Sequence, residues 1–419
     1  NFGSKHFGFF VNIAFFIANR LRQIGRGKKT VSARIITIAT AAVAIGTAMI
    51  LITLVTVTGL QEAIENKTAA FNGHYSISTF SNHNSKLSLT PVGVPQSIKE
   101  QLRALEGVVG LEGVAYKGGL LKTDTSFEGI LFKGVAATFD WSKLEDFLVQ
   151  GRYPSAAQSN EILISQRLAN RLALALDDRV LGYFQKDARQ RVPNIRRFIV
   201  VGIYNSGFPE VDNTYVLGSI AQIQGLNKWS ASEVGAYEVF APKTLDDPKL
   251  LQTIYNSLPM DLDVIPLKEQ YPSIFQWMAL LDYNIIIILV VMTIVGVINI
   301  ATALLIMIFE RSRMIGLLKT LGSSNLLIHC IFLTNGGFIL LRGLFWGNAI
   351  GLLFYFGQRY GQWITLDPIT YFVEVAPVSL HFGSWLMMNL LLLGVSLLML
   401  WFPVMIVAKI SPTKTLKFK

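Results

Sequence analysis

Long apolar segments alternate with charged ones along this chain, and their lengths predict four membrane-spanning helices. A helix needs about 20 consecutive, mostly apolar residues to cross the hydrocarbon core of a bilayer. Four segments meet this requirement, and we assign the spans to residues 35–60, 283–309, 326–356 and 382–407. The first begins too far along the chain, and is too long, to be the core of a cleaved signal peptide.

Arg342 lies near the middle of the third span. A charged side chain at that depth is costly unless it faces protein, a lipid headgroup or water. We therefore expect its partner to be a backbone carbonyl, a lipid phosphate, or a polar side chain such as Asn299 or Asn335.

The segment 61–276 has the composition of a globular domain. Apolar and polar residues alternate at 74–80 and 196–204, which predicts strands, whereas the patterns at 95–107 and 160–176 indicate helices. With about 200 residues, the segment can bury its own core. The expected fold class is an α-helical membrane protein with four transmembrane helices and a mixed α+β periplasmic domain, of one or two modules, inserted between helices 1 and 2.

Shorter segments flank and connect the spans. Within the N-terminal segment 1–34, residues 8–24 are apolar and aromatic but too short to span, and basic residues follow, which predicts an interfacial helix bound to membrane lipid. The loops between later spans are 310–325 and 357–381, and the tail is 408–419.

Composition supports the membrane assignment, because 52% of the residues are hydrophobic, 15% are charged and the mean hydropathy is +0.45. The net charge of +10 comes from Lys and Arg before the first span, between the second and third, and after the fourth. Such residues mark cytoplasmic segments. We therefore expect both termini and the loop 310–325 in the cytoplasm, and 61–276 outside. The positive charge reflects topology, so nucleic acid is not an expected partner.

Candidate catalytic and metal-binding residues are few. The single cysteine, Cys330, excludes an intrachain disulfide, the five histidines are scattered, and no GxSxG or HExxH motif occurs. The string GRGKKT at 25–30 lacks the spacing of a phosphate-binding loop. We expect no catalytic residue, no metal site and no cofactor bound by this chain. If the protein is driven by ATP, the ATPase would be another chain.

Small residues predict close helix packing within the membrane. The first span opens with the string TIATAAVAIGTAM, and the third carries glycines at four-residue spacing, which places them on one helix face. These helix-packing glycines are Gly343, Gly347 and Gly351.

The loop after the second span contains a short amphipathic stretch, which could serve as a lever for a partner or rest on the membrane surface without one. Its sequence at 310–322, ERSRMIGLLKTLG, resembles the coupling segment of the permeases of mechanotransmitting ABC transporters, the group that includes MacB, FtsX and the lipoprotein-releasing LolC and LolE. Strings typical of the LolC/LolE branch lie at 16–22, 55–61, 160–172, 196–216, 366–378 and 409–418. The chain departs from that branch in lacking its usual Pro-Ala pair within 401–410 and in carrying Arg342.

The resemblance implies a non-catalytic permease subunit in the bacterial inner membrane. It would pair with a second permease copy or a paralogue and with a dimer of cytoplasmic ATPase subunits, which use ATP and Mg. It would extract lipoproteins from the outer leaflet and pass them to a periplasmic carrier. Two alternatives remain: an efflux permease with a separate ATPase, and an FtsX-like regulator of a cell-wall hydrolase. A MacB-like fusion to the ATPase is not expected, because about 34 residues precede the first span.

The resemblance also implies two sets of site residues. In the coupling segment, Met314, Ile315 and Leu318 would enter a groove of the ATPase, and charged residues would orient the contact. The full set is Glu310, Arg311, Arg313, Met314, Ile315, Gly316, Leu318, Lys319, Leu321 and Gly322. At the outer ends of the first two spans, a lipid-modified substrate would contact Leu54, Val57, Leu60, Trp277, Leu280, Leu281, Asn284 and Ile288, although this stripe could equally pack against helices or face ordinary lipid.

Overall fold

The computed structural model describes residues 31–83, 87–88, 90–155, 160–185, 192–241, 248–367, 373 and 375–405. The expected interfacial helix at 8–24 and the basic tail at 408–419 lie outside these residues. The chain divides into two compact units. Unit 1 comprises residues 1–61, 277–365 and 375–419, and unit 2 comprises residues 62–276 and 366–374.

Four long helices dominate unit 1, and each is long and apolar enough to cross a membrane. They are α2 (Val31–Asn72), α10 (Pro272–Glu310), α12 (Asn325–Gly361) and α14 (Phe382–Val404). A short helix, α11 (Ser312–Thr320), lies between α10 and α12. The four apolar helices expected from the sequence are therefore found among the residues that the structure describes.

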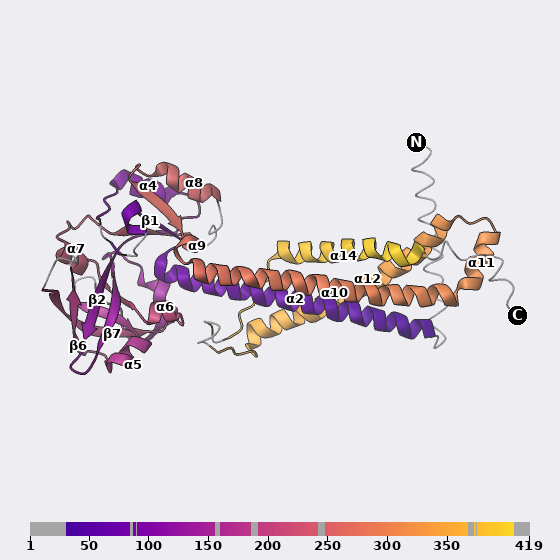
Figure 1. Cartoon of the computed structure of the whole chain (residues 1–419), viewed down its shortest axis with the longest axis horizontal. Helices are drawn as coiled ribbons and strands as arrows, with labels where there is room; N and C mark the ends of the chain where they lie inside the picture. The colour runs from indigo at the N-terminus through magenta and orange to yellow at the C-terminus, as the bar shows by residue number, and fades with distance from the viewer. Residues whose placement is uncertain are drawn as a thin grey trace. The chain divides into compact units, whose positions relative to one another are not determined.

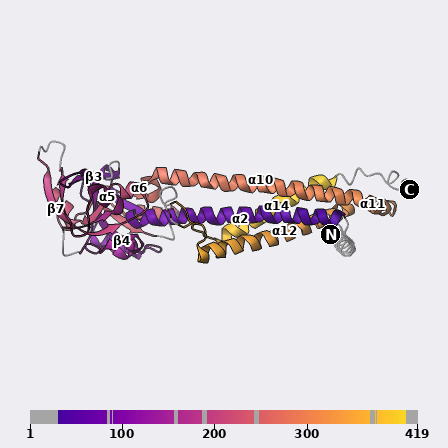
Figure 2. The same cartoon turned by 90° about the horizontal axis from the view of Figure 1, so that it is seen from below.

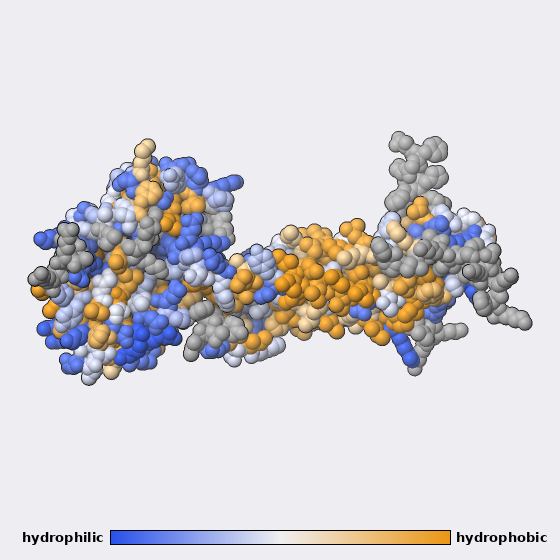
Figure 3. Space-filling model, in the orientation of Figure 1, coloured by the Kyte–Doolittle hydropathy of each residue, from blue (hydrophilic) through white to orange (hydrophobic). Residues whose placement is uncertain are grey.

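The four helices run side by side with alternating directions (Figures 1 and 2). Helix α2 is antiparallel to α10, since Gly46 faces Met292 and Val43 faces Gly296. Helices α12 and α14 are also antiparallel, and Asn348 and Asn389 hydrogen-bond between them. Hydrophobic residues gather along the outside of this bundle (Figure 3), as expected of a surface that contacts lipid.

Unit 2 contains one mixed sheet, of ten strands in the described part of the chain. The strands are β1 (Tyr75–Thr79), β2 (Gly110–Lys122), β3 (Phe127–Val135), β4 (Leu148–Gly151), β5 (Glu161–Ser165), β6 (Arg179–Phe184), β7 (Asn194–Tyr204), β8 (Tyr215–Ser219), β9 (Ala236–Phe240) and β10 (Leu262–Pro266). The connecting helices are α3 (Phe80–His83), α4 (Gln96–Ala104), η2 (Trp141–Phe147), α5 (Gln166–Leu172), α6 (Pro209–Asp212), α7 (Ala221–Asn227), α8 (Pro248–Ser257) and α9 (Leu267–Gln270).

Six of these strands close into a ring. Pairing runs from β2 through β3, β8, β5, β7 and β6, and β6 pairs with β2 again. Closure removes free edges. Phe132, Phe184 and Phe198 stack or meet edge to face, with ring centroids 5.3–6.1 Å apart. Gly119 and Gly182 leave room for them, since a Cβ at either position would lie within 2.7 Å of a ring atom.

The remaining strands extend the sheet beside the ring. Strand β9 pairs with β2, β1 pairs with β9, and β10 pairs with β1. Helices α4 and α8 lie next to each other near β1 (Figure 1), and Leu102, Leu250 and Ile254 on these helices are buried in the core that also contains the ring phenylalanines.

The structure confirms the strands expected near 74–80 and 196–204 and the helix within 95–107. The expectation of a continuous helix over 160–176 is wrong, because residues 161–165 form β5. All five are buried, and β5 pairs with β7 on one side and β8 on the other. A short apolar run buried on both faces does not alternate, so periodicity cannot distinguish it from a helix. Ser165 then caps α5 by accepting a hydrogen bond from the amide of Leu168.

Candidate functional site

The C-terminus of α2 is buried within unit 2. Phe71 packs against the rings of Phe147 and Tyr204, with centroids 5.1 and 5.4 Å away. Gly73 follows the helix with φ +69°, and its amide donates to the carbonyl of Ala69. Glycine adopts this left-handed conformation without strain, which makes it the usual residue after a helix end. The helix therefore stops at a fixed point among the strands.

A buried ion pair caps this helix end. The ammonium of Lys133, on β3, donates to the carbonyl oxygen of Phe71 and to both carboxylate oxygens of Glu238, on β9, at 2.6 and 2.8 Å. Both side chains are 1% exposed. Tyr116 on β2 donates its hydroxyl to the same carboxylate. A cation beside the last carbonyls of a helix also interacts favourably with the helix dipole.

Burial perturbs the titration of this cluster. Desolvation lowers the pKa of Lys133, and the adjacent carboxylate of Glu238 opposes that change. Burial, and then the negative charge of Glu238, raise the pKa of Tyr116 well above its usual value. The hydroxyl of Tyr116 therefore stays protonated at neutral pH and remains a donor.

A second set of hydrogen bonds links the same helix end to the start of α10. The Oδ1 atom of Asn72 accepts from the hydroxyl of Tyr271 at 2.7 Å, and the hydroxyls of Tyr271 and Tyr215 are 3.0 Å apart. Tyr271 directly precedes α10, and Tyr215 begins β8. Burial raises the pKa of Tyr215 to about 12. We call Asn72, Lys133, Glu238, Tyr116, Tyr215 and Tyr271 the helix-end network.

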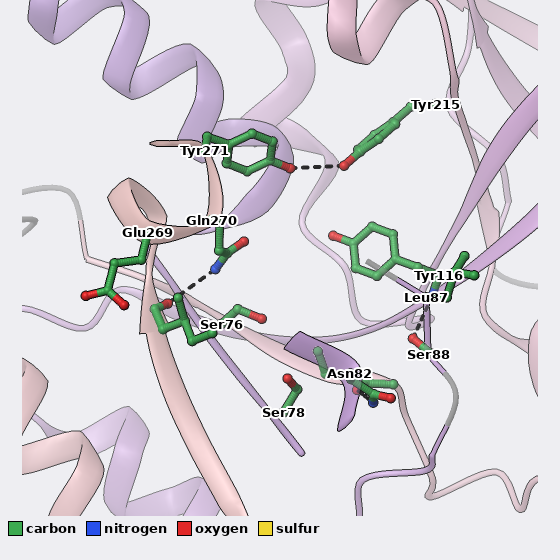
Figure 4. Close-up of a pocket in the computed structure, with 13 residues that line it drawn as sticks. Ser76, Ser78, Asn82, Leu87, Ser88, Tyr116, Tyr215, Glu269, Gln270 and Tyr271 are labelled. Atoms are coloured by element: carbon green, nitrogen blue, oxygen red, sulfur yellow. Dashed lines mark hydrogen bonds between the residues drawn. The ribbon is translucent and has the colours of Figure 1, made fainter. Parts of the chain in front are cut away.

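A cavity of about 250 Å³ adjoins the network (Figure 4). Three tyrosines of the network line it, together with serine, asparagine and glutamine side chains, so its wall is part polar and part apolar. In Figure 4 the hydroxyls of Tyr271 and Tyr215 point toward each other. Within the described residues, no group of His, Cys, Asp and Glu could hold a metal ion.

Reasoning from the sequence missed the helix-end network. Its one visible signal is a charged residue inside each of two short apolar strands, Lys133 in β3 and Glu238 in β9. These residues are 105 positions apart, so only the sheet brings them together.

The coupling segment forms α11 and the turns around it, with Gly322 at φ +85°. One assignment within it needs correction. Ile315 is 0% exposed and belongs to the core of unit 1 with Ile308 and Ile328, so its side chain is not available to a partner's groove. Leu317 and Leu321 are instead 55% and 76% exposed. Met314 and Leu318 are half-buried, and Leu318 packs against Leu327 and Ile331.

The rest of the coupling set varies in exposure. Glu310, Arg313 and Gly322 are exposed, Arg311 and Lys319 are half-buried, and Gly316 is buried.

The residues proposed to face a substrate occupy different environments. Leu280 and Asn284 on α10 are exposed, and Leu54, Val57, Trp277 and Leu281 are half-buried. Leu60 is buried, and Ile288 packs against the core of unit 1. Gln61 donates to Asp282 at 2.9 Å and joins α2 to α10 at this level.

The three glycines of α12 face α2. A Cβ at Gly343 would lie 2.6 Å from Cβ of Val43, one at Gly347 would lie 2.5 Å from Cβ of Thr47, and one at Gly351 would meet the side chain of Leu51. The two helices are parallel here, because each contact joins residues 300 positions apart.

Arg342 is exposed on α12. Of the two amides suggested for it, Asn299 donates to the carbonyl of Val295 and Asn335 to that of Ile331, each within its own helix. The expectation that Arg342 has a backbone carbonyl, a lipid phosphate or a polar side chain as its partner stays a prediction. Polar residues in a membrane helix commonly bond to the carbonyl four residues earlier, and that bond competes with contacts to other side chains.

Comparison with known protein families finds a family model for each of two parts of the chain. Residues 37–245 match the family model "MacB-like periplasmic core domain", and residues 286–412 match "FtsX-like permease C-terminal". The two matches are consecutive: the first covers most of α2 and much of unit 2, and the second covers most of α10 together with α12 and α14.

Three individual proteins are similar to this chain. The lipoprotein-releasing system transmembrane protein LolE of Haemophilus influenzae is 21% identical over 97% of this chain and 99% of its own length. The corresponding LolC of Neisseria meningitidis is 24% identical over 54% of this chain and 57% of its own. The crystal structure of the periplasmic region of MacB from Actinobacillus actinomycetemcomitans covers 48% of this chain and 91% of its own, with 12% identity and a TM-score of 0.33. The chain is thus a LolC/LolE-type permease of the MacB/FtsX superfamily, with a MacB-like periplasmic core and an FtsX-like C-terminal region.

Proposed function

We propose that this chain is the membrane subunit of an ABC transporter that releases lipoproteins from the bacterial inner membrane. Separate ATPase subunits, using ATP and Mg, drive the cycle, and a second permease copy or a paralogue completes the membrane part. The lipoprotein leaves the outer leaflet and passes to a periplasmic carrier. The chain itself hydrolyses no ATP.

The observation that carries this proposal is the length of α2 and α10. They contain 42 and 39 residues, or about 60 Å each at 1.5 Å per residue, whereas the hydrocarbon core is about 30 Å thick. Both helices contribute residues to both units. A continuous helix is stiff, so movement at its membrane end can reach its other end.

Extraction of a lipoprotein needs such a device. Each methylene buried in the membrane contributes about 0.8 kcal/mol to anchoring, so removing several acyl chains from the bilayer requires external energy. The exposed and half-buried apolar residues near the outer ends of α2 and α10, including Val57 and Leu281, are suited to contact acyl chains.

Reconstitution tests the proposal. The chain, its ATPase and any paralogue would be placed in liposomes with a triacylated lipoprotein, and ATP would be added with the soluble carrier. We expect ATP-dependent transfer of lipoprotein to the carrier, and photo-crosslinks from Val57 and Leu281 to the lipoprotein without nucleotide. Crosslinks to the partner permease alone, with no transfer, would contradict the proposal, and hydrolase activation or export of small molecules would support the alternatives.

A further inference from the structure

The helix-end network fixes α2 at its last turn. The last carbonyls of a helix have no partner within it, and a buried one needs another donor. Lys133 supplies that donor to Phe71, and Asn72 is held through its side chain by Tyr271. A Cβ at Gly73 would lie 2.9 Å from Cβ of Glu238, so the chain also passes close to β9 here.

The same residues hold the start of α10. Tyr271 is buried with Ala69 and Leu267, and Ile274 and Phe275 in the first turn of α10 pack against this cluster. The end of one long helix and the start of another are therefore joined directly, by the hydrogen bond between Asn72 and Tyr271 and by apolar contact.

The network is also built into the sheet. Lys133 lies on β3, Tyr116 on β2, Tyr215 on β8 and Glu238 on β9. These are adjacent strands in the order β9, β2, β3, β8. Three of them belong to the closed ring, where every strand is hydrogen-bonded on both sides.

A buried ion pair is a poor way to gain stability, because well-packed apolar residues often stabilise as well or better. Its directional hydrogen bonds do fix orientation, and a helix end held by them resists sliding and rotation relative to the strands.

We propose that the helix-end network is the joint through which movement of α2 and α10 is passed to the sheet of unit 2, with Lys133, Glu238, Asn72 and Tyr271 as positioning residues. This inference rests on the proposed function, since it concerns how ATP-driven movement reaches the periplasmic core. The joint acts by keeping both helix ends and four strands in one rigid body during the cycle.

The test uses the full chain in complex with its ATPase. Spin labels would be attached to Asp124→Cys in unit 2 and to Tyr360→Cys in unit 1, both exposed positions, in a Cys330→Ala background. The distance between the two labels would report movement of unit 2 relative to unit 1. Two joint variants are compared. K133M/E238L replaces the ion pair with apolar residues of similar size, and Y271F removes one hydroxyl. The control, K143M/E112L, removes another ion pair of unit 2, which links η2 to β2.

We expect the parent and the control to show a change of this distance on addition of ATP. In both joint variants ATP hydrolysis persists, the distance change is lost, and lipoprotein released per ATP falls about tenfold. Thermal unfolding and co-purification with the ATPase verify that the variants are folded. If K133M/E238L does not fold, Y271F decides alone.

The proposal is overturned if the folded joint variants keep the parental distance change, or if the control loses it equally. The distance readout does not depend on the cargo. A parent complex that moves with ATP but releases no lipoprotein would refute the proposed function, and the joint would still be judged by the loss or retention of movement in its variants.

Discussion

Gly59 lies where α2 meets the backbone of the segment that precedes α14. An added Cβ would lie 2.5 Å from the carbonyl oxygen of Pro377 and 2.6 Å from Cα of Val378. Backbone atoms cannot rotate away as a flexible side chain can. The hydroxyl of neighbouring Thr58 donates to the carbonyl of Ser379 at 2.9 Å, so the backbone at Ser379 is also hydrogen-bonded to α2.

We therefore expect Gly59→Ala to lower the free energy of unfolding by about 1–3 kcal/mol through overpacking. Thermal unfolding of the purified chain in detergent would measure it. Gly394→Ala on α14 is the matched control, because nothing lies within 4 Å of a Cβ there. Equal stability of the two variants would contradict the expectation.

His74 makes unit 2 sensitive to acid. Its Nδ1 accepts from the amide of Ala241 at 3.1 Å, and its Nε2 is buried with no hydrogen-bond partner among the described residues. Burial lowers its pKa from 6.5 to about 4. The imidazole of His74 thus binds a proton less readily in the folded state than in the unfolded state. Its contribution to the free energy of unfolding is therefore present above pH 6.5 and is lost as the pH falls toward 4.

Protonation of His74 lowers the free energy of unfolding by about 3 kcal/mol. We expect His74→Asn, whose side-chain oxygen can still accept from Ala241, to remove most of the difference in thermal unfolding temperature between pH 7 and pH 4.5. His381→Asn, at an exposed histidine, should leave that difference unchanged. A parental pH dependence in His74→Asn would refute the assignment.

At the scale of elements, α11 has two different faces. Ile315 is part of the core of unit 1, while Leu317 and Leu321 are exposed. If this segment binds the ATPase, the exposed leucines are the ones that can enter its surface. Burying an unpaired charge there would disfavour the complex.

We expect Leu321→Asp to abolish co-purification with the ATPase while the chain stays folded. Leu326→Asp, at a residue 67% exposed in the first turn of α12, is the control. Ile315→Ala should instead cost about 2–5 kcal/mol of stability as a core truncation. Undiminished ATPase binding by Leu321→Asp would show that this face is not the ATPase-binding surface.

Helices α12 and α14 are joined by a polar contact in the membrane. Asn348 donates to Asn389 at 2.7 Å, and its Oδ1 accepts from the indole of Trp385 at 2.7 Å. Such interhelical bonds contribute about 1 kcal/mol in lipid.

Asn348→Leu and Asn389→Leu should therefore each destabilise the chain by about that amount. The double variant should be less destabilised than the sum of the two, because either single substitution already removes the contact between the amides. A double-mutant cycle by thermal unfolding in detergent measures the coupling. Strict additivity would show that the contact contributes nothing.

At the scale of the whole molecule, the distribution of Lys and Arg predicts which side each segment occupies. In a Cys330→Ala background, a cysteine replacing Arg313 should react with an impermeant reagent only after the membrane is opened. Cysteines replacing Lys99 and Asp367 should react in intact cells. External reactivity at position 313 would reverse the topology.

The sequence by itself determined the four apolar helices, the globular insertion and the family. An apolar run such as 283–309 predicts a spanning helix by itself, because crossing a bilayer requires about 20 apolar residues whatever the rest of the chain does. The strand at 75–79 and the helix at 96–104 were also visible in the sequence, since apolar and polar residues alternate along the strand and apolar residues recur at helical spacing along the helix.

Tertiary structure decided what depends on distant partners. Residues 161–165 form a strand because β7 and β8 flank them, and Ile315 is buried because other helices cover it. Lys133 and Glu238 meet, beside the end of α2, only once β3 and β9 are placed in one sheet. Local periodicity reports how each residue alternates with its neighbours, whereas burial and pairing depend on strands and helices that lie far away in the sequence.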